Sequence, residues 1–218
     1  MYCTISIELF FLLTNQRWSP MYTLIRGFCR QIVKKDEYSV LILGLDQAGK
    51  TTYLEQAKTN FNETYKSMPL HKITSTVGLN IGQIALEGIL MKFWDLGGQT
   101  ELQSLWDKYY IESHGVIFII DSSDPGRFDE SKGAFDKMIQ NHALEGVPLL
   151  IIANKQDLDF AFPVSEIRQV FQDSAHLIGS RDCSMRGASA LKGDGVIDAI
   201  RWMAEKIKKN SIRRPPNV

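Results

Sequence analysis

The sequence predicts an α/β fold in which a mostly parallel sheet is covered by helices on both faces. Three observations support this prediction. Short apolar runs at 39–43, 115–121 and 148–154 are typical of parallel strands buried on both faces. Amphipathic stretches of helical period lie between these runs. The chain has 218 residues, is 44% hydrophobic and 23% charged, and so has enough apolar material for one such domain with short tails.

The elements follow one another in a strand–helix alternation that predicts right-handed crossovers and a doubly wound sheet. Strands are expected where apolar runs are bounded by polar residues or glycine: 39–43, 79–87, 90–94, 115–121 and 148–154. The second and third of these flank Gly88, which predicts a hairpin. Helices are expected directly after the glycines of 44–49, at 128–141, around Ile167 to Phe171 and at 196–207.

Composition excludes several classes of function. Lys and Arg together number 25, as do Asp and Glu, and the formal net charge of zero argues against a nucleic-acid binder that neutralises phosphates. The three cysteines have no CxxC spacing, which indicates reduced thiols in a cytosolic-type compartment. No apolar run is long enough to span a membrane. We therefore expect a protein that at most lies on a membrane surface.

The two ends of the chain differ from its centre. Residues 1–20 are expected to be an upstream extension outside the fold, with Met21 as the native start; a genuine extended isoform is the alternative. Residues 21–36 place their apolar side chains on one stripe and predict an N-terminal amphipathic helix. Residues 37–210 should form the main domain. The basic, proline-punctuated tail at 211–218 is expected to be frayed.

The strongest motif runs from Gly44 to Thr51, a Walker A pattern that follows a buried strand and precedes a helix. Gly44 and Gly49 allow a tight turn whose N–H groups point at phosphate oxygens, and the helix N-terminus favours the anion. Lys50 supplies a charge to the β- and γ-phosphates, and the Thr51 hydroxyl is expected to ligate Mg²⁺. The predicted nucleotide-binding residues of this loop are Gly44, Asp46, Gln47, Ala48, Gly49, Lys50, Thr51 and Thr52.

The base should be selected by Asn154, Lys155 and Asp157, which follow an apolar strand. The Asp157 carboxylate can accept from both N1–H and the 2-amine of guanine, whereas adenine would leave it unpaired. Asn154 would brace the loop and reach the other edge of the base, and the Lys155 stem would lie along the ring. Ser189 and Ala190 can bring a backbone N–H to guanine O6. The predicted ligands are therefore GTP and GDP with Mg²⁺.

A third group of residues is expected at the γ-phosphate. Asp95 can hold Mg²⁺ through its water shell, and the Gly98 N–H can contact the γ-phosphate. Gln99 is the predicted catalytic residue, because its amide can orient the attacking water. The Thr76 hydroxyl, in a polar loop, would join Thr51 as a ligand of Mg²⁺ when the γ-phosphate is present.

Together these residues resemble the ADP-ribosylation-factor family of small GTPases. The resemblance covers the chain from about Met21 to the last helix and rests on the segments 44–46, 76–80, 94–99 and 105–110. Further segments favour one branch of this family: 21–24, 35–38, 58–73, 181–183 and 214–216. The resemblance implies a P-loop small-GTPase fold, with a mixed, mostly parallel six-stranded sheet flanked by helices and preceded by the N-terminal helix.

The resemblance also implies a function and partners. The chain should be a GTP-binding switch of the trans-Golgi network that recruits effectors and downstream small GTPases in vesicle trafficking, peripherally bound through an integral-membrane receptor. Most members of the family carry a myristoylated glycine after Met1, which neither Met1-Tyr2 nor Met21-Tyr22 offers. In this family the hairpin between the two phosphate-sensing loops slides in register and releases the N-terminal helix. Leu79, Trp94 and Tyr109 would then present an apolar patch to effectors, although each also suits a core position.

Regulation should come from other proteins. Heterotrimeric-type α subunits carry an arginine three residues before the switch threonine, where this chain has Ile73. We therefore expect slow intrinsic hydrolysis, an activating protein that supplies an arginine, and a guanine nucleotide exchange factor. Two alternatives remain open: a GTP-stabilised interaction module with little hydrolysis, and an ATP-using kinase, which Asn154 to Asp157 disfavour.

Overall fold

The computed structural model describes residues 35–69, 72–76 and 78–217. Its centre is one six-stranded sheet in the order β2-β3-β1-β4-β5-β6. β2 and β3 are antiparallel, and every other neighbouring pair is parallel. The strands are β1 (Asp36–Leu43), β2 (Leu79–Leu86), β3 (Ile89–Leu96), β4 (Gly115–Asp121), β5 (Leu149–Asn154) and β6 (Cys183–Gly187). The predicted mixed, mostly parallel six-stranded sheet is confirmed.

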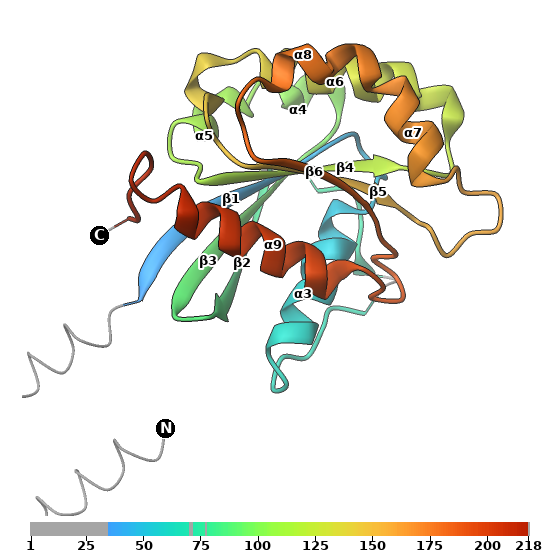
Figure 1. Ribbon diagram of the computed structural model, residues 1–218. Coiled ribbons are helices and arrows are strands. Elements are labelled where there is room, and N and C mark those ends of the chain that lie inside the picture. Colours follow the sequence, from blue (N-terminus) through green and yellow to red (C-terminus); the bar gives the residue numbers. More distant parts are fainter. Residues whose placement is uncertain (1–34, 70–71, 77, 218) are drawn as a thin grey trace, which may run out of the picture. The chain divides into compact units, whose positions relative to one another are not determined.

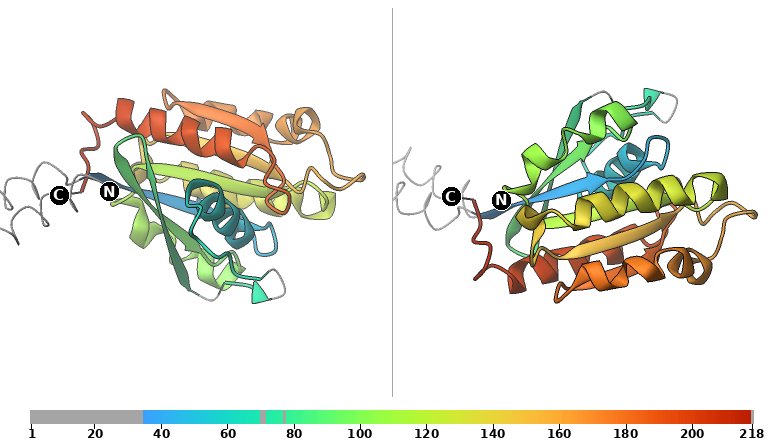
Figure 2. Two further views of the ribbon diagram at one scale, coloured as in Figure 1. Left: turned by 90° about the horizontal axis from the view of Figure 1, so that it is seen from below. Right: turned by 90° about the horizontal axis from the view of Figure 1, so that it is seen from above.

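Helices cover both faces of this sheet (Figure 1). α3 and α9 lie on one face, and α6 with the shorter helices lies on the other, as the two views of Figure 2 show. The helices are α3 (Lys50–Phe61), α4 (Thr100–Gln103), α5 (Asp107–Tyr110), α6 (Phe128–Ile139), α7 (Val164–Val170), α8 (Ala175–Ile178) and α9 (Val196–Lys209). Short 3₁₀ turns occupy Pro125–Arg127, His142–Leu144 and Gln172–Ser174.

β1 lies between β3 and β4, so its side chains contribute to the apolar layers on both faces. Val40 and Ile42 pack on the side of α3 and α9, whereas Leu41 and Leu43 pack on the side of α6. All four side chains are fully buried. This explains why the run at 39–43 is apolar without alternation. It also brings the loop that follows Leu43 to the carboxyl edge of the sheet, between two neighbouring strand ends.

The hairpin expected around Gly88 is present. Glu87 and Gly88 have positive φ values of 49° and 85°, which places both residues of the turn in the left-handed region. Two such residues between strands favour a tight hairpin turn, because its twist matches that of the strands. Leu79 pairs with Leu96 at the far end of the hairpin.

The C-terminal tail differs from the expectation that it would be frayed. The Arg214 guanidinium donates to Ile111 O and Ser113 O, both at 3.0 Å. The Asn217 N–H donates to Glu37 O at 2.8 Å and forms a bridge at the start of β1. The tail therefore lies along the domain, because its polar groups satisfy carbonyls that loop and strand ends leave free. A basic, proline-containing sequence carries no local signal for such distant partners.

Two further expectations concern the N-terminal helix and Trp94. The predicted helix at 21–36 falls outside the described residues up to position 34, and Asp36 already belongs to β1. Trp94 was expected either on an exposed patch or in the core, and it lies in the core, only 8% exposed. Its ring packs edge-on against Tyr109, with centroids 5.4 Å apart. Of the three residues of the expected patch, Leu79 is the one that is clearly exposed, at 38%.

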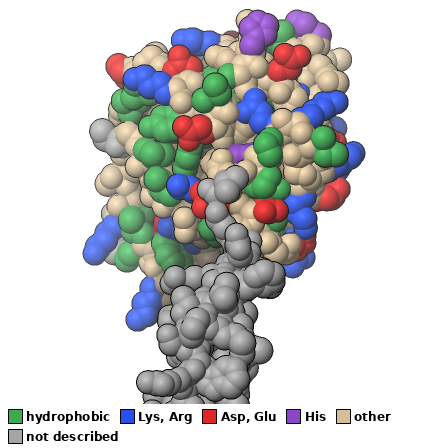
Figure 3. All heavy atoms as spheres, turned by 90° about the vertical axis from the view of Figure 1, so that its left-hand side faces the viewer, with side chains coloured by type: hydrophobic (Ala, Val, Ile, Leu, Met, Phe, Trp, Pro, Cys, Tyr) green, Lys and Arg blue, Asp and Glu red, His purple; other side chains and the backbone are tan. Residues whose placement is uncertain are grey.

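Acidic and basic side chains are interspersed over the described part of the surface in Figure 3, in keeping with the net charge of zero. Within residues 35–69, 72–76 and 78–217, no helix is both long and apolar enough to cross a membrane.

Candidate functional site

The loop from Gly44 to Thr51 joins the end of β1 to the start of α3. Gly44 has a φ of 133°, and a Cβ at this position would lie 2.2 Å from Ile119 O of β4. Gly49, the residue before α3, has a φ of 90°. Only glycine combines these conformations with such a close approach of two backbones. The backbone of the loop is therefore wrapped around the N-terminus of α3, which is a favourable place for an anion.

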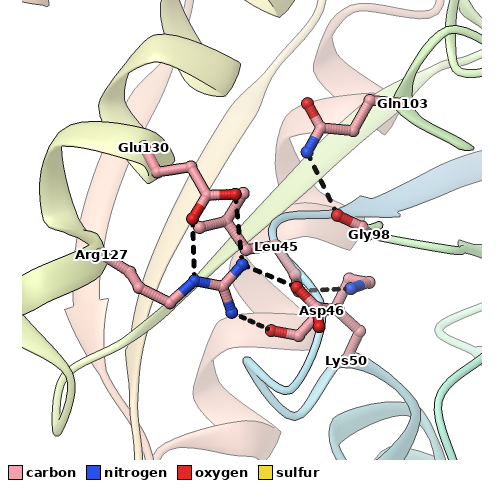
Figure 4. Close-up of polar contacts among 7 residues, drawn as sticks. All are labelled: Leu45, Asp46, Lys50, Gly98, Gln103, Arg127 and Glu130. Atoms are coloured by element: carbon pink, nitrogen blue, oxygen red, sulfur yellow. Dashed lines mark hydrogen bonds and ion pairs between the residues drawn. The ribbon is translucent and has the colours of Figure 1, made fainter. Parts of the chain in front are cut away.

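Lys50 lies under this loop and is only 5% exposed. Its ammonium group donates to Leu45 O at 2.6 Å (Figure 4). Burial lowers the pKa of Lys50 to about 8, although the nearby carboxylates of Asp95 and Asp46 act in the opposite direction. A buried cation of this kind is stabilised when an anion occupies the loop.

Three oxygen-bearing side chains converge beside Lys50. The Thr51 hydroxyl lies 2.7 Å from the Thr76 hydroxyl and donates to Asp95 Oδ2 at 2.7 Å. Asp95 is fully buried, and its Oδ1 has no hydrogen-bond partner in the described structure. Burial raises the pKa of Asp95, while the hydrogen bond from Thr51 and the charge of Lys50 lower it. Hydroxyl and carboxylate oxygens with one buried acceptor free are the ligand chemistry that suits Mg²⁺.

A cavity of about 320 Å³ opens over these side chains. It is lined by the phosphate loop, by residues 73–76 and by Gly98. No cluster of three His, Cys, Asp or Glu side chains with metal-binding geometry exists in the described part of the chain. The residues of this cavity therefore do not suit a transition metal. They suit an anionic ligand together with a hard cation.

Gly98 lies against the phosphate loop. A Cβ at Gly98 would come within 2.3 Å of Leu45 C, so this approach also requires glycine. The neighbouring backbone is held by two side chains: Gln103 Nε2 donates to Gly98 O at 3.1 Å, and Trp106 Nε1 donates to Gly97 O at 2.9 Å. Gln99 comes next, immediately before α4, and is not among the residues that line the cavity.

A second cavity of about 270 Å³ adjoins the first and shares Gly49, Thr52 and Ile73 with it. Asn154, Lys155 and Asp157 line it, together with Leu158, Ala190 and Leu191. Its walls are mainly apolar, which suits a flat ring with a few polar edges. The two cavities together therefore match an elongated ligand that has an anionic end and a planar end.

Asn154 links the two cavities. Its Nδ2 donates to Ala48 O of the phosphate loop at 2.8 Å, and its Oδ1 accepts from the Ala190 N–H at 2.9 Å. One of the backbone N–H groups of the segment expected to face guanine O6, that of Ala190, is thus bonded to Asn154 in this structure. Asp157 Oδ1 accepts from the Ser189 hydroxyl at 2.7 Å, which orients the carboxylate.

Several residues of the site were not expected from the sequence. Asp121, at the end of β4, pairs with Lys155 at 2.5 Å and directs that side chain. Asn80 Nδ2 donates to Asp95 Oδ2 at 3.3 Å. For Asp121 a signal was present, since a polar residue that ends a buried parallel strand lies at the carboxyl edge of the sheet. For Asn80, Gln103 and Trp106 no local pattern points to these partners.

Comparison with known proteins agrees with this geometry. Residues 25–207 match the model of the ADP-ribosylation factor family. The chain is 56% identical over 196 residues to ADP-ribosylation factor-related protein 1 of Bos taurus, covering 90% of this chain and 97% of the relative. The human protein of that name is 54% identical over the same length, with the same coverage.

Two more distant relatives extend the comparison. ADP-ribosylation factor-like protein 3 of Saccharomyces cerevisiae is 44% identical over 197 residues, covering 90% of this chain and 98% of the relative. Among solved structures, the Arl6 BBS3 small GTPase of Trypanosoma brucei with bound GppNp superposes with a TM-score of 0.68 at 30% identity. That match covers 79% of this chain and 98% of the other.

Proposed function

The chain belongs to the ADP-ribosylation factor family of small GTPases, and from this premise we propose that it is a switch of the trans-Golgi network whose GTP-bound form recruits effectors and downstream small GTPases in vesicle trafficking. Membership of this family means that the chain is a GTPase, that it binds GTP and GDP with Mg²⁺, and that it works as a guanine-nucleotide switch. The proposed location at the trans-Golgi network rests on the resemblance of segments 21–24, 35–38, 58–73, 181–183 and 214–216 to one branch of the family.

One observation carries the proposed switch: the hydroxyls of Thr51 and Thr76 and the carboxylate of Asp95 meet at one point. Thr51 belongs to α3, Asp95 to β3, and Thr76 to the loop before β2. A ligand at this point contacts the loop that carries Thr76 as well as the rigid core. Occupancy of the site therefore biases the position of a loop, which is how a γ-phosphate is sensed.

In the proposed mechanism, the N–H groups of the phosphate loop and the ammonium of Lys50 bind the phosphates. Asp157, held by Ser189, accepts from the guanine edge, and Asn154 keeps the base cavity and the phosphate loop together. Thr51 and Thr76 would hold Mg²⁺, which would supply positive charge to offset that of the β- and γ-phosphates. The Gly98 N–H faces the γ-phosphate. Gln99, the next residue in the chain, turns toward the attacking water and serves hydrolysis.

Hydrolysis by the isolated protein is slow in this proposal. None of the described residues that line the phosphate cavity is an arginine, and position 73 is isoleucine. The family implies an exchange factor, an activating protein and effectors. We place the missing arginine on the activating protein, and membrane attachment on an integral-membrane receptor of the Golgi.

The alternative, a GTP-stabilised interaction module with little hydrolysis, is less well supported. A module of that kind has no use for a glutamine beside the γ-phosphate-sensing Gly98, because the glutamine serves only to position water.

Localisation of a tagged full-length chain tests the proposed place of action. Gln99→Leu should hold the GTP form and concentrate on trans-Golgi membranes, whereas Thr51→Asn should weaken Mg²⁺ and GTP binding and leave the protein diffuse. Equal distribution of the two variants, or enrichment of Gln99→Leu on another organelle, would contradict the proposal.

A further inference from the structure

Arg127 contacts the phosphate loop but does not line the nucleotide cavity. It is the last residue of the turn Pro125–Arg127 and directly precedes α6, whereas Asp46 lies 81 positions earlier in the loop. Its Nη2 donates to Asp46 Oδ1 at 2.7 Å, and its Nη1 donates to Asp46 O at 3.2 Å (Figure 4). One guanidinium thus holds both the side chain and the main chain of the same loop residue.

Glu130 fixes the orientation of this guanidinium. Arg127 Nε donates to Glu130 Oε2 at 2.8 Å, and Nη2 donates to Glu130 Oε1 at 3.2 Å. Glu130 belongs to the first turn of α6, so both members of this fork are anchored to one rigid helix end. A bidentate pair of this kind presets the arginine and reduces the entropy lost on contact with Asp46.

The contact has a direct bearing on the loop conformation. The carbonyls of Leu45 and Asp46 are consecutive, and each is held by a cation: Leu45 O by Lys50 and Asp46 O by Arg127. Without Arg127 the Asp46 carbonyl would be free to rotate toward the phosphates, where an oxygen dipole opposes the anion. The contact thus keeps the oxygens of this stretch away from the place where the N–H groups must point.

The contact also neutralises a charge. The Asp46 side chain is 24% exposed and the Arg127 side chain 32% exposed, so the pair is only partly screened by water. Asp46 lines the phosphate cavity. An unpaired carboxylate at that position would repel the phosphates of a nucleotide.

A direct catalytic role for Arg127 does not fit the geometry. Its guanidinium points at Asp46 and Glu130, and it does not line the phosphate cavity. It lines instead a space of about 30 Å³ behind the loop, together with Phe128 and Ser131. A space of that size holds water but no nucleotide.

We propose that Arg127 is a positioning residue that, through Asp46, holds the phosphate loop in its nucleotide-binding form and thereby slows nucleotide release. This inference rests on the proposed nucleotide site at the phosphate loop. The connection between β4 and α6 thus helps to control how long the nucleotide stays bound.

Release of a fluorescent GDP analogue from the full-length protein, measured in Mg²⁺ with an excess of unlabelled GDP, tests this inference. Arg127→Met should accelerate release by about 10- to 100-fold, the equivalent of a hydrogen bond between charged groups. Asp46→Asn should also accelerate release, but by less than Arg127→Met, because its amide keeps only an uncharged contact with Arg127. The double variant should release nucleotide no faster than Arg127→Met, because the two substitutions remove the same contact.

Arg201→Met, at an exposed position of α9, is the matched control for loss of one positive charge and should leave release unchanged. Thermal unfolding of all variants separates loss of folding from loss of retention. If Arg127→Met released nucleotide at the wild-type rate, or if the effects of Arg127→Met and Asp46→Asn multiplied in the double variant, the inference would be wrong. If the wild-type protein did not bind the analogue, the nucleotide site itself would be disproved.

Discussion

The hydroxyl oxygens of Thr51 and Thr76 lie 2.7 Å apart, although 25 positions separate the two residues in the chain. Thr51 is fixed in the first turn of α3, whereas Thr76 lies in the stretch 73–76, which has no regular secondary structure. The contact therefore places an irregular loop segment directly at the phosphate site. Such loops are the parts of a protein whose position a ligand changes most easily.

Thr76→Ala should reduce the preference for GTP over GDP. In our account the Thr76 hydroxyl joins Mg²⁺ only when the γ-phosphate is present, so its loss weakens GTP binding selectively. We expect the ratio of the two affinities to fall by about 10-fold, the value of one hydrogen bond to a charged group. Paired titrations with GDP and a non-hydrolysable GTP analogue measure this ratio. Thr59→Ala, whose hydroxyl bonds only to Glu55 O within α3, is the control. Equal weakening of both nucleotides by Thr76→Ala would contradict the assignment.

Asp157→Asn should lower the affinity for GTP by at least about 100-fold, because an amide cannot accept from both N–H groups of guanine. Xanthine carries a carbonyl in place of the 2-amine, so xanthosine triphosphate should gain affinity in the variant. Competition of GTP, ATP and xanthosine triphosphate against one labelled nucleotide gives all three constants. An unchanged preference for GTP over ATP would place base recognition elsewhere.

Ile73→Arg should accelerate intrinsic GTP hydrolysis. Ile73 lines both cavities and lies three residues before Thr76, so an arginine there can reach the phosphates from within the chain. We expect a gain of about 10- to 30-fold, the difference between GTPases with and without an internal arginine. Ile73→Met has a similar size but no charge and should hydrolyse GTP at the wild-type rate. If the two variants were equally fast, positive charge at this position would have no catalytic effect.

His114 should make the folded state sensitive to acid. Its Nδ1 accepts from the Ser39 N–H at 3.0 Å, and its Nε2 lies 2.8 Å from Pro215 O of the C-terminal tail. Burial lowers the pKa of His114, and the nearby Arg214 lowers it further, whereas the bond to Pro215 O raises it. A histidine whose folded pKa lies below its unfolded value of about 6.5 stabilises the fold above that pH. The contribution is lost as the pH falls through the folded pKa, because the protonated ring cannot accept from Ser39.

Urea denaturation of the wild type and of His114→Gln between pH 7.5 and 5 measures this effect. The free energy of unfolding of the wild type should fall below about pH 6.5 more steeply than that of the variant, by up to ~1.4 kcal/mol per pH unit. All other titrating groups are common to the two proteins. Parallel curves would show that His114 has the same pKa in the folded and unfolded states.

Local patterns in the sequence predict much of this fold. The run at 39–43 predicts the central strand, because burial on both faces requires apolar residues. The glycines of the phosphate loop predict the start of α3, because positive φ favours glycine. The turn at Gly88 is predicted for the same reason. These features depend on neighbours in the chain.

Features that depend on distant partners were not predictable in this way. Arg127 reads as one of many charged residues at a helix start, yet it contacts Asp46 across 81 positions. Trp94 suits both a surface patch and a core position by its sequence, and contact with Tyr109 from another element decides for the core. Asn217 reads as part of a frayed end, although its partner Glu37 lies at the opposite end of the domain's sequence. In each case the deciding contact is set by topology.

Single-turnover hydrolysis of GTP bound to the full-length protein in Mg²⁺, compared between wild type and Gln99→Leu, tests the central claim most directly. A hydrolysing switch predicts slow turnover by the wild type, on the order of 10⁻⁴ s⁻¹ without an activating protein. It predicts a rate at least about 10-fold lower in Gln99→Leu, with unchanged GTP affinity, since Gln99 acts on water. Equal rates in the two proteins, no hydrolysis in either, or turnover within seconds by the wild type alone would contradict it.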